Sequence, residues 1–222
     1  RIIADQQAYL EVRGVSISSL SPLLAQPDVV NAVAVLVITA DRGMCGNYNL
    51  AACRLALEFW EKRKIAGQKV LVLVMGRKGE RFFQKRRAEI IHTSGWNRKG
   101  VLPAEIEQFH SLLLPLLLSG TVQEVYAVYT QFISPIQRLP KIKRLLPVAM
   151  DLHGREGEAD KKWYYEPSFR EIIDELLAIH VRVQLLDILL ESYASVQGAR
   201  MITMEEATER ANKTRWEYRG QY

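Results

Sequence analysis

The stretch that decides the fold is Val33-Ala34-Val35-Leu36-Val37-Ile38-Thr39-Ala40, which runs directly into Asp41-Arg42-Gly43-Met44-Cys45-Gly46-Asn47-Tyr48-Asn49. The first part is continuously apolar, rich in β-branched residues and too short to span a membrane. Such a run predicts a strand that is buried on both faces, as in parallel sheets covered by helices. The polar part predicts a loop at the carboxyl end of that strand, where α/β proteins usually bind ligands or partners. Asn49 is predicted to cap the helix that follows.

Beyond this stretch, predicted strands and helices alternate along the chain. Apolar runs predict strands at 69–75, 89–92 and 121–130. The helical pattern predicts helices at 50–65, from the turn at 76–79 to residue 87, and at 103–118. A further edge strand, where proline is tolerated, is predicted for Leu145-Leu146-Pro147-Val148. The alternation predicts an α/β fold: a Rossmann-like, mostly parallel sheet flanked by helices and built from right-handed βαβ units.

The last part of the chain predicts one long C-terminal helix that exceeds its domain. Ser168 and Glu171 form a capping-box pattern, and no proline follows them. Apolar residues then recur in one stripe at three-, four- and seven-residue spacing: Phe169, Ile172, Leu176, Val183, Leu186, Leu190, Tyr193 and Val196. About 45 residues make a helix of about 67 Å, whereas a domain of about 150 residues is about 38 Å across. The helix is therefore expected to project by about 30 Å. Small residues near its middle predict the close approach of another helix: Ala194, Ser195, Gly198 and Ala199.

Composition excludes several classes of protein. The 222 residues are 48% hydrophobic and 25% charged, which predicts one soluble core with an appended element. Cys45 and Cys53 form neither a metal-ligand set nor a disulfide framework, so a reducing compartment is expected. The net charge of +5 comes from basic runs without interleaved aromatic residues. Solvated faces or an acidic protein partner are therefore favoured over nucleic acid.

The loop after the first strand is the main candidate for chemistry. Asp41 could be an aspartyl nucleophile, but the strong forms of that site have a second acid two residues on, where this chain has Gly43. An Asp41–Arg42 pair, or backbone hydrogen bonds that shape the turn, is the favoured interpretation. The chain lacks G-x-G-x-x-G and Walker motifs, and the 76–79 turn is interpreted as a basic surface turn rather than an anion site. The histidines lack metal-binding spacing, so no metal or cofactor is expected, and Cys45 is interpreted as a small buried residue.

Several motifs, in this order along the chain, resemble the gamma subunit of F-type ATP synthase. The first is Ile38-Thr39-Ala40-Asp41-Arg42-Gly43-Met44-Cys45-Gly46 with Asn49, where the family typically has Asp-Arg-Gly-Leu-Cys-Gly. The others are Gly76-Arg77-Lys78-Gly79, Phe82-Phe83, Tyr129 to Ile133, Leu145-Leu146-Pro147, Tyr164 to Pro167, Glu191-Ser192, Ala194-Ser195, Ala199-Arg200-Met201, Met204 and Ala207-Thr208. Together they span nearly the whole chain, and Met44 in place of Leu is a conservative change.

The resemblance implies a central-stalk rotor subunit that couples ion-driven rotation of a membrane ring to ATP synthesis in the catalytic head. Such a subunit is non-catalytic, has no cofactor and lies peripherally on the cytoplasmic face of the inner or energy-transducing membrane. Its implied partners are the alpha/beta catalytic hexamer, the epsilon subunit and the membrane rotor ring, which transports protons or sodium ions, and they include no nucleic acid. The alternative from the residues themselves is a stand-alone nucleotide-binding α/β enzyme built on the Asp41 loop.

The resemblance also implies roles for particular residues and segments. Contact with the rotor ring or epsilon is expected from Trp163, Tyr165 and Glu166. The signature turn comprises Asp41, Arg42, Gly43, Cys45 and Gly46. The shaft helix includes Ser195, Arg200, Met201, Met204 and Thr208. The expected segments are a remnant of the amino-terminal shaft helix at 1–13, an α/β foot at 14–167, the long shaft helix at 168–213 and a tail at 214–222. Gamma subunits normally have a longer first helix and a different closing stretch, so both ends are expected to be trimmed or altered.

Overall fold

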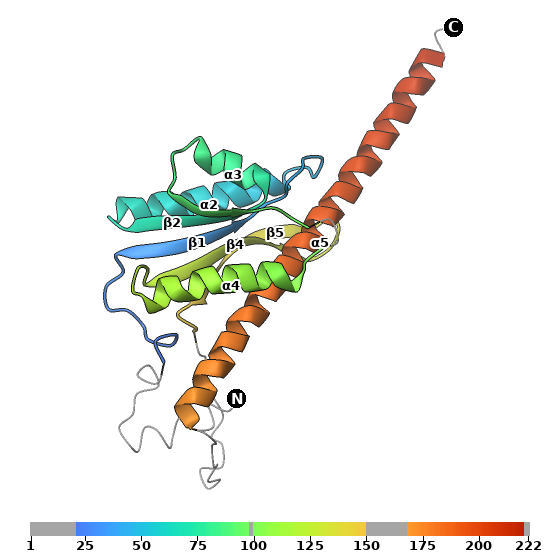
Figure 1. Cartoon of the computed structure of the whole chain (residues 1–222). Coiled ribbons are helices and arrows are strands. Elements are labelled where there is room, and N and C mark those ends of the chain that lie inside the picture. Colours follow the sequence, from blue (N-terminus) through green and yellow to red (C-terminus); the bar gives the residue numbers. More distant parts are fainter. Residues whose placement is uncertain (1–20, 98–99, 150–167, 220–222) are drawn as a thin grey trace.

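The computed structural model of the protein describes residues 21–97, 100–149 and 168–219 (Figure 1). The strands are β1 (Ala32–Ile38), β2 (Lys69–Met75), β3 (Ile90–Ser94), β4 (Glu124–Phe132) and β5 (Arg138–Leu146). The helices are α2 (Tyr48–Ile65), α3 (Arg77–Gln84), α4 (Pro103–Leu118) and α5 (Phe169–Arg219). Strands and helices alternate as far as β4, as the apolar pattern predicts.

β1 lies at the centre of a five-stranded sheet with the order β3-β2-β1-β4-β5. It pairs in parallel with β2 and β4, and β2 pairs in parallel with β3. β5 is antiparallel to β4 and forms one edge. Every residue of β1 is buried. The predicted α/β fold with a mostly parallel sheet is therefore confirmed.

The side chains of β1 point alternately into two cores, because successive residues of a strand face opposite sides of the sheet. Leu36 belongs to the core that α4 and α5 cover, together with Phe109. Val35 belongs to the core that α2 and α3 cover, together with Phe83. Figure 1 shows the two pairs of helices on opposite faces of the sheet. This double burial explains why the strand is apolar at consecutive positions rather than at alternate ones.

The second half of the sheet differs from the prediction. In place of a short edge strand at 145–148, β5 extends over Arg138–Leu146 and forms a hairpin with β4. Pro140 lies within β5. Proline lacks an amide hydrogen, but it is tolerated here because β5 is an edge strand and has a neighbouring strand on one side only. Most of β5 is only half-buried and basic, as suits an edge strand that must not pair with another chain. The sequence pattern did not predict this strand, because lysine and arginine side chains occupy positions on both of its faces and no alternation of apolar and polar residues is visible.

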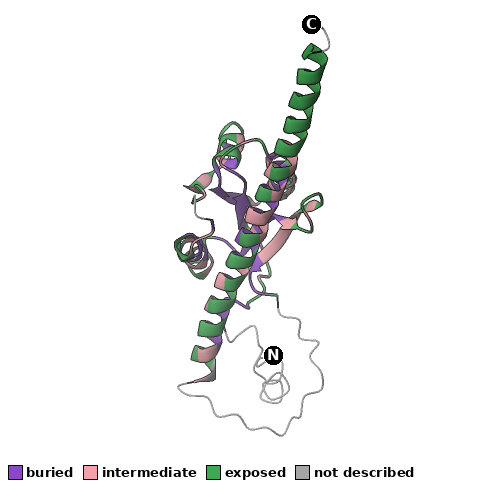
Figure 2. Cartoon of the chain, turned by 90° about the vertical axis from the view of Figure 1, so that its right-hand side faces the viewer, coloured by how far each residue is buried: buried purple, intermediate pink, exposed green. Residues whose placement is uncertain are grey.

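α5 is longer than predicted and projects well beyond the sheet. Its 51 residues correspond to about 76 Å. The helix continues through most of the expected tail at 214–222 to Arg219, since no proline or glycine occurs between Gly198 and Gly220. Residues 204–219 are all exposed, and Figure 2 shows this end of α5 standing clear of the rest of the chain. Within the described residues, no helix is both long enough and apolar enough to span a membrane.

The sheet and α4 cover a different face of α5 from the predicted stripe. The buried apolar residues of α5 in this core are Ile173, Leu177, Val181, Leu185, Ile188 and Leu189. Four members of the predicted stripe are exposed instead: Leu176, Val183, Leu186 and Leu190. The helix has apolar residues on two neighbouring faces, and helical spacing alone cannot tell which of them the domain covers.

Within the described residues, small residues of α5 lie against the sheet and its hairpin. Ser195 donates a hydrogen bond from Oγ to the carbonyl oxygen of Thr130 (3.1 Å), and the Thr130 amide donates to Ser192 Oγ (3.4 Å). A Cβ added at Gly198 would lie 3.3 Å from the Phe132 ring. α5 therefore crosses β4 at close range, and larger side chains at these positions would force the two elements apart.

A histidine buried between α4 and α5 predicts that the fold is sensitive to acid. His110 is 6% exposed, its Nε2 atom has no hydrogen-bond partner among the described residues, and burial lowers the pKa of its imidazole. Arg182 lowers this pKa further, whereas Glu107 and the backbone of Ala178 act in the opposite direction. The folded chain therefore resists protonation at a pH where the unfolded chain, with an imidazole pKa of about 6.5, takes up a proton.

The free energy of unfolding should consequently decrease as the pH falls below about 6.5, because the unfolded state then binds more protons than the folded state. Urea denaturation at pH 7 and pH 5 measures this decrease. His110→Gln removes the titrating group, so this variant should lose less stability between the two pH values than the parent protein. An identical loss in both proteins would show that His110 is not responsible.

The projecting end of α5 should exchange its amide hydrogens faster than the packed part. Residues 204–219 are all exposed, and a helix without tertiary packing is only marginally stable in water. Amide hydrogen exchange on the isolated chain should therefore show stronger protection at 172–190 than at 201–212. Equal protection of the two segments would contradict this expectation and would indicate a partner for the projecting end.

Candidate functional site

Asp41 lies just beyond the carboxyl end of β1 and joins three loops. Its Oδ1 atom accepts a hydrogen bond from the Arg77 amide (3.1 Å), and its Oδ2 atom accepts one from the Trp96 amide (3.0 Å). Arg77 begins α3 and Trp96 follows β3, so one carboxylate holds together the loops after β1, β2 and β3. Negative charge is also favourable at the start of α3. This geometry supports the interpretation that Asp41 shapes the turn through backbone hydrogen bonds.

Thr39 is a buried partner in this cluster that sequence reasoning did not single out. Its Oγ1 atom lies within donating distance of the carbonyl oxygens of Met75 (3.0 Å) and Gly76 (3.1 Å), and it accepts a hydrogen bond from the Gly79 amide (2.9 Å). A Cβ at Gly76 would lie 2.6 Å from the carbonyl carbon of Thr39, far inside van der Waals contact. The glycines at 76 and 79 thus allow β1 and the start of α3 to approach closely. The available signal was a polar residue at the end of an otherwise apolar strand.

Asn49 closes the signature turn but does not cap α2. Its Oδ1 atom accepts a hydrogen bond from the Ala40 amide (2.8 Å), and its Nδ2 atom donates to Cys45 Sγ (3.1 Å). The capping position is Asn47, whose side chain makes no capping bond. The predicted capping role of Asn49 is therefore wrong, because Asn49 lies inside the first helical turn and reaches back across the loop.

Cys45 is buried within this turn, and burial raises the pKa of its thiol although Arg200 and Lys78 act to lower it. A protonated thiol is a poor nucleophile. The interpretation of Cys45 as a small buried residue is therefore supported. Its neighbours Met44 and Gly46 both have positive φ angles, of 59° and 54°, which turn the chain sharply on either side of the cysteine.

The turn packs against α5 at the point where the helix leaves the domain. Cys45 and Tyr48 form a small apolar cluster with Val196 and Ala199. The Tyr48 hydroxyl donates a hydrogen bond to the carbonyl oxygen of Ser192 (3.3 Å). The signature turn therefore helps to set the direction in which α5 projects, although the turn and this part of α5 are about 150 residues apart in sequence.

Trp96 adds a second connection between the loops and α5. Its ring centroid lies 5.6 Å from that of Tyr193, and its indole nitrogen donates to the carbonyl oxygen of Thr39. Asp41, which binds the Trp96 amide, is thereby linked to α5 through a single side chain. Sequence reasoning missed Trp96 and Tyr48, because single loop aromatics far apart in the chain share no periodic pattern.

The residues expected on the shaft helix divide into two groups. Ser195 is buried against β4, and Arg200 is half-buried. Met201 and Met204 are exposed, and so is Thr208, whose hydroxyl donates back to the Met204 carbonyl. Three residues expected to contact the ring or epsilon lie outside the described part of the chain: Trp163, Tyr165 and Glu166.

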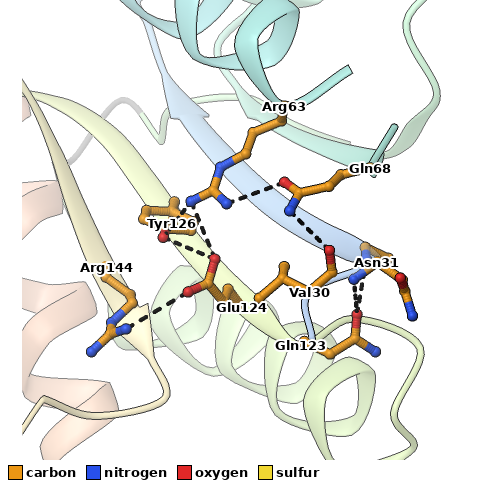
Figure 3. Close-up of polar contacts among 9 residues, drawn as sticks. Val30, Asn31, Arg63, Gln68, Gln123, Glu124, Tyr126 and Arg144 are labelled. Atoms are coloured by element: carbon orange, nitrogen blue, oxygen red, sulfur yellow. Dashed lines mark hydrogen bonds and ion pairs between the residues drawn. The ribbon is translucent and has the colours of Figure 1, made fainter. Parts of the chain in front are cut away.

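A second polar cluster lies at the amino-terminal end of the strands (Figure 3). Glu124, at the start of β4, forms ion pairs with Arg63 of α2 (3.2 Å) and Arg144 of β5 (3.7 Å). The Tyr126 hydroxyl donates to Glu124 Oε2 (3.0 Å), and the Arg63 guanidinium carbon lies 5.0 Å from the centre of the Tyr126 ring. The carboxylate is shared among these three partners. We therefore interpret this cluster as a structural tie between α2 and the β4–β5 hairpin.

The two ends of the sheet thus differ in what they hold together. The amino-terminal end fastens α2 to the edge of the sheet, whereas the carboxyl end gathers three loops against α5. This arrangement defines a class of α/β domain in which a loop cluster positions a long projecting helix. The sequence matches the family model described as ATP synthase over residues 4–222, and the chain belongs to the ATP synthase family.

The relatives are ATP synthase gamma chains. The gamma chain of Chlorobaculum parvum is 34% identical over 200 residues, which are 88% of this chain and 68% of the relative. The gamma chain of Moorella thermoacetica is 36% identical over 193 residues, which are 86% of this chain and 65% of the relative. The resemblance to gamma subunits is thereby confirmed. A gamma chain is a non-catalytic central-stalk subunit, and the alternative of a stand-alone nucleotide-binding enzyme is not favoured.

Solved structures share the fold. One is the central stalk and c-ring of the Tetrahymena thermophila mitochondrial ATP synthase, with a TM-score of 0.64 and 17% identity over 91% of this chain and 87% of that chain. Another is the rotor of the Euglena gracilis mitochondrial ATP synthase, with a TM-score of 0.53 and 15% identity over 98% of this chain and 89% of that chain. At these identities the likeness concerns the fold: a sheet domain with one long helix.

Proposed function

We propose that this chain transmits rotation between a membrane rotor ring and the alpha/beta catalytic hexamer, with its α/β domain as the foot and α5 as part of the shaft. The observation that supports this most directly is the course of α5. The helix is anchored along the sheet by buried residues from Ile173 to Ala199 and then projects over residues 204–219, which are all exposed. A lever needs such a rigid attachment at one end and a free arm at the other.

An exposed apolar seam along the packed half of α5 supports a coiled-coil shaft. Its members are spaced alternately by three and four residues: Leu176, Ile179, Val183, Leu186 and Leu190. This is the spacing of a coiled-coil interface. Residues 1–13, which lie outside the described residues, have apolar side chains at helical spacing. We assign this amino-terminal segment to the seam as the antiparallel partner of α5.

The foot needs a surface that contacts the ring, and the proposal assigns this surface to Trp163, Tyr165 and Glu166. These residues precede the start of α5 at the end opposite to its projecting arm. An aromatic pair supplies contact area, and an acid suits polar, partly basic loops. The proposal further places the epsilon subunit against this foot and the whole subunit peripherally on the cytoplasmic face of the membrane. It applies equally to a proton-driven and a sodium-driven ring.

Cross-linking tests the ring contact. With Tyr165→Cys in the assembled complex, oxidation should produce a disulfide to a cysteine placed in the ring loops. A cysteine introduced at the exposed residue Ile65, the last residue of α2, serves as the matched control and should give no such product. Equal yields from both positions, or none from Tyr165→Cys, would refute the assignment of the ring contact.

Co-assembly tests the proposed function as a whole. The chain, expressed with the alpha, beta and epsilon subunits of its own complex, should co-purify with them in a fixed ratio. Val183→Asp on the exposed seam should weaken the coiled coil and reduce the yield of complex, because it places a charge in an apolar interface. Val29→Asp, at an exposed apolar site outside the seam, should not. Elution of the parent chain as a free monomer would overturn the proposal.

A further inference from the structure

The short helix α3 and the turn after it form a strongly basic surface. Between residues 77 and 87 there are six cations and one acid, Glu80, so this segment has a net charge of +5, equal to that of the whole chain. All six cations are exposed. They are Arg77, Lys78, Arg81, Lys85, Arg86 and Arg87. We call this the α3 basic surface.

Neighbouring acids do not neutralise the α3 basic surface. The Glu80 carboxylate accepts a hydrogen bond from Gln84 rather than pairing with a cation. Asp41 uses both of its oxygens for backbone amides, and Glu89 is paired with Lys69 of β2. None of the ion pairs found within residues 21–97, 100–149 and 168–219 involves a cation of the α3 basic surface. Exposed like charges at this density repel one another unless an anionic partner approaches.

The helix that carries the surface covers the opposite face of the sheet from the packed part of α5. α3 and α2 cover one face of the sheet, whereas α4 and α5 cover the other (Figure 1). A partner on the α3 basic surface could therefore bind without displacing any contact that anchors α5.

The side chains of the α3 basic surface indicate which kind of anionic partner fits it. A basic helix that binds a membrane surface exposes large apolar side chains beside its cations, but Phe83 is fully buried here and the Phe82 ring is covered by the Arg86 guanidinium, 3.6 Å from its centroid. The same guanidinium occupies one face of the Phe82 ring, so the segment has no series of open aromatic rings on which successive nucleotide bases could stack. Four of the six cations are arginines, whose planar guanidinium binds carboxylates in a bidentate manner.

We propose that the α3 basic surface is a docking site for an acidic, aspartate- and glutamate-rich segment of another polypeptide. The proposal rests on the proposed function in one respect, namely that the chain works among other protein subunits. Its binding is electrostatic, so it accelerates association and decreases with salt. Such a contact can be made and released during rotation, because exposed charge pairs are individually weak.

A labelled peptide of aspartate and glutamate tests the docking site on the full chain by fluorescence anisotropy. Arg81→Glu with Lys85→Glu should weaken binding at least about tenfold. The matched control, Lys62→Glu with Lys64→Glu on α2, makes the same change in net charge at two exposed lysines and should change the affinity less than about twofold. Thermal unfolding confirms that both variants are folded. Equal losses in the two variants would overturn the proposal, since they would reflect net charge alone.

Two further measurements separate the alternatives. Vesicles of phosphatidylglycerol with phosphatidylcholine, or a double-stranded DNA, that bound the α3 basic surface more tightly than the peptide would overturn the choice of a polypeptide. In the co-assembled complex, a carbodiimide should couple Lys78 or Lys85 to a carboxylate of another subunit. Co-assembly without this product would refute the docking site and leave the proposed function intact. Selective peptide binding by a chain that does not co-assemble would refute the proposed function alone.

Discussion

Replacing Gly76 with alanine is expected to destabilise the α/β domain severely. Gly76 has a φ of 99°, and a Cβ at this position would lie 2.6 Å from the carbonyl carbon and 2.7 Å from the Oγ1 atom of Thr39. Both are buried in the central layer, so neither can move away without separating β1 from β2. The substitution thus combines an unfavourable backbone conformation with a backbone clash, and we expect a loss of about 4 kcal/mol or more. That is a large part of the stability of a typical domain.

Gly67 provides a matched control. It also has a positive φ, of 77°, but nothing lies within 4 Å of the position of its Cβ. Gly67→Ala should therefore lower the free energy of unfolding by about 1–2 kcal/mol, which is the energy needed to hold a residue with a side chain in the left-handed backbone conformation. Urea denaturation followed by far-ultraviolet circular dichroism compares the two variants. If Gly76→Ala were as stable as Gly67→Ala, the close approach of β1 to the start of α3 would not be a requirement of the fold.

Asp41→Asn is expected to destabilise the domain by about 2 kcal/mol, because it replaces charge-assisted hydrogen bonds to two backbone amides. The amide side chain offers only one acceptor oxygen, so either Arg77 or Trp96 loses its partner. Loosening Trp96 should also weaken its contact with Tyr193 on α5. Urea denaturation followed by tryptophan fluorescence measures the loss of stability.

The exposed Asp28, which makes no hydrogen bond or ion pair with any described residue, is the control site. Asp28→Asn should change stability by less than about 0.5 kcal/mol. Any trace of ATP hydrolysis in the preparation should be the same in the Asp41→Asn variant as in the parent chain, because Asp41 is assigned no chemical role. The loss of a stoichiometric activity from the purified chain would contradict this assignment and revive the stand-alone enzyme.

The apolar run of β1 predicted a strand buried on both faces, because such a strand must be apolar at every position. The alternation of this and other predicted strands with helices then predicted the mostly parallel sheet. The length of α5 was equally decisive. A helix of that length cannot be contained in a domain of this size, so its projection follows from geometry alone. Because Gly43 stands where a second catalytic acid would be expected, the sequence favoured a turn-shaping interpretation of Asp41, and the two backbone hydrogen bonds support it.

Which face of α5 the domain covers was decided only by the tertiary structure. Ile173 and Leu177 are buried, whereas Leu176 and Val183 are exposed, although both sets have helical spacing. The difference arises because α5 crosses β4 where Ser192, Ser195 and Gly198 permit close approach, and that crossing fixes the rotation of the helix about its axis. A periodic pattern specifies the angle between residues on a helix but not the direction of the surface that it meets.

The contacts within the loop cluster were likewise not predictable from the sequence pattern. Thr39, Trp96 and Tyr193 are brought together from a strand end, a loop and a helix. Their contacts depend on the strand order of the sheet, which places the ends of β1, β2 and β3 side by side. Local sequence determines strands, helices and turns because neighbouring residues interact through a fixed backbone geometry. Contacts between residues distant in sequence exist only once the parallel sheet has formed, so the tertiary structure alone reveals how the signature turn positions α5.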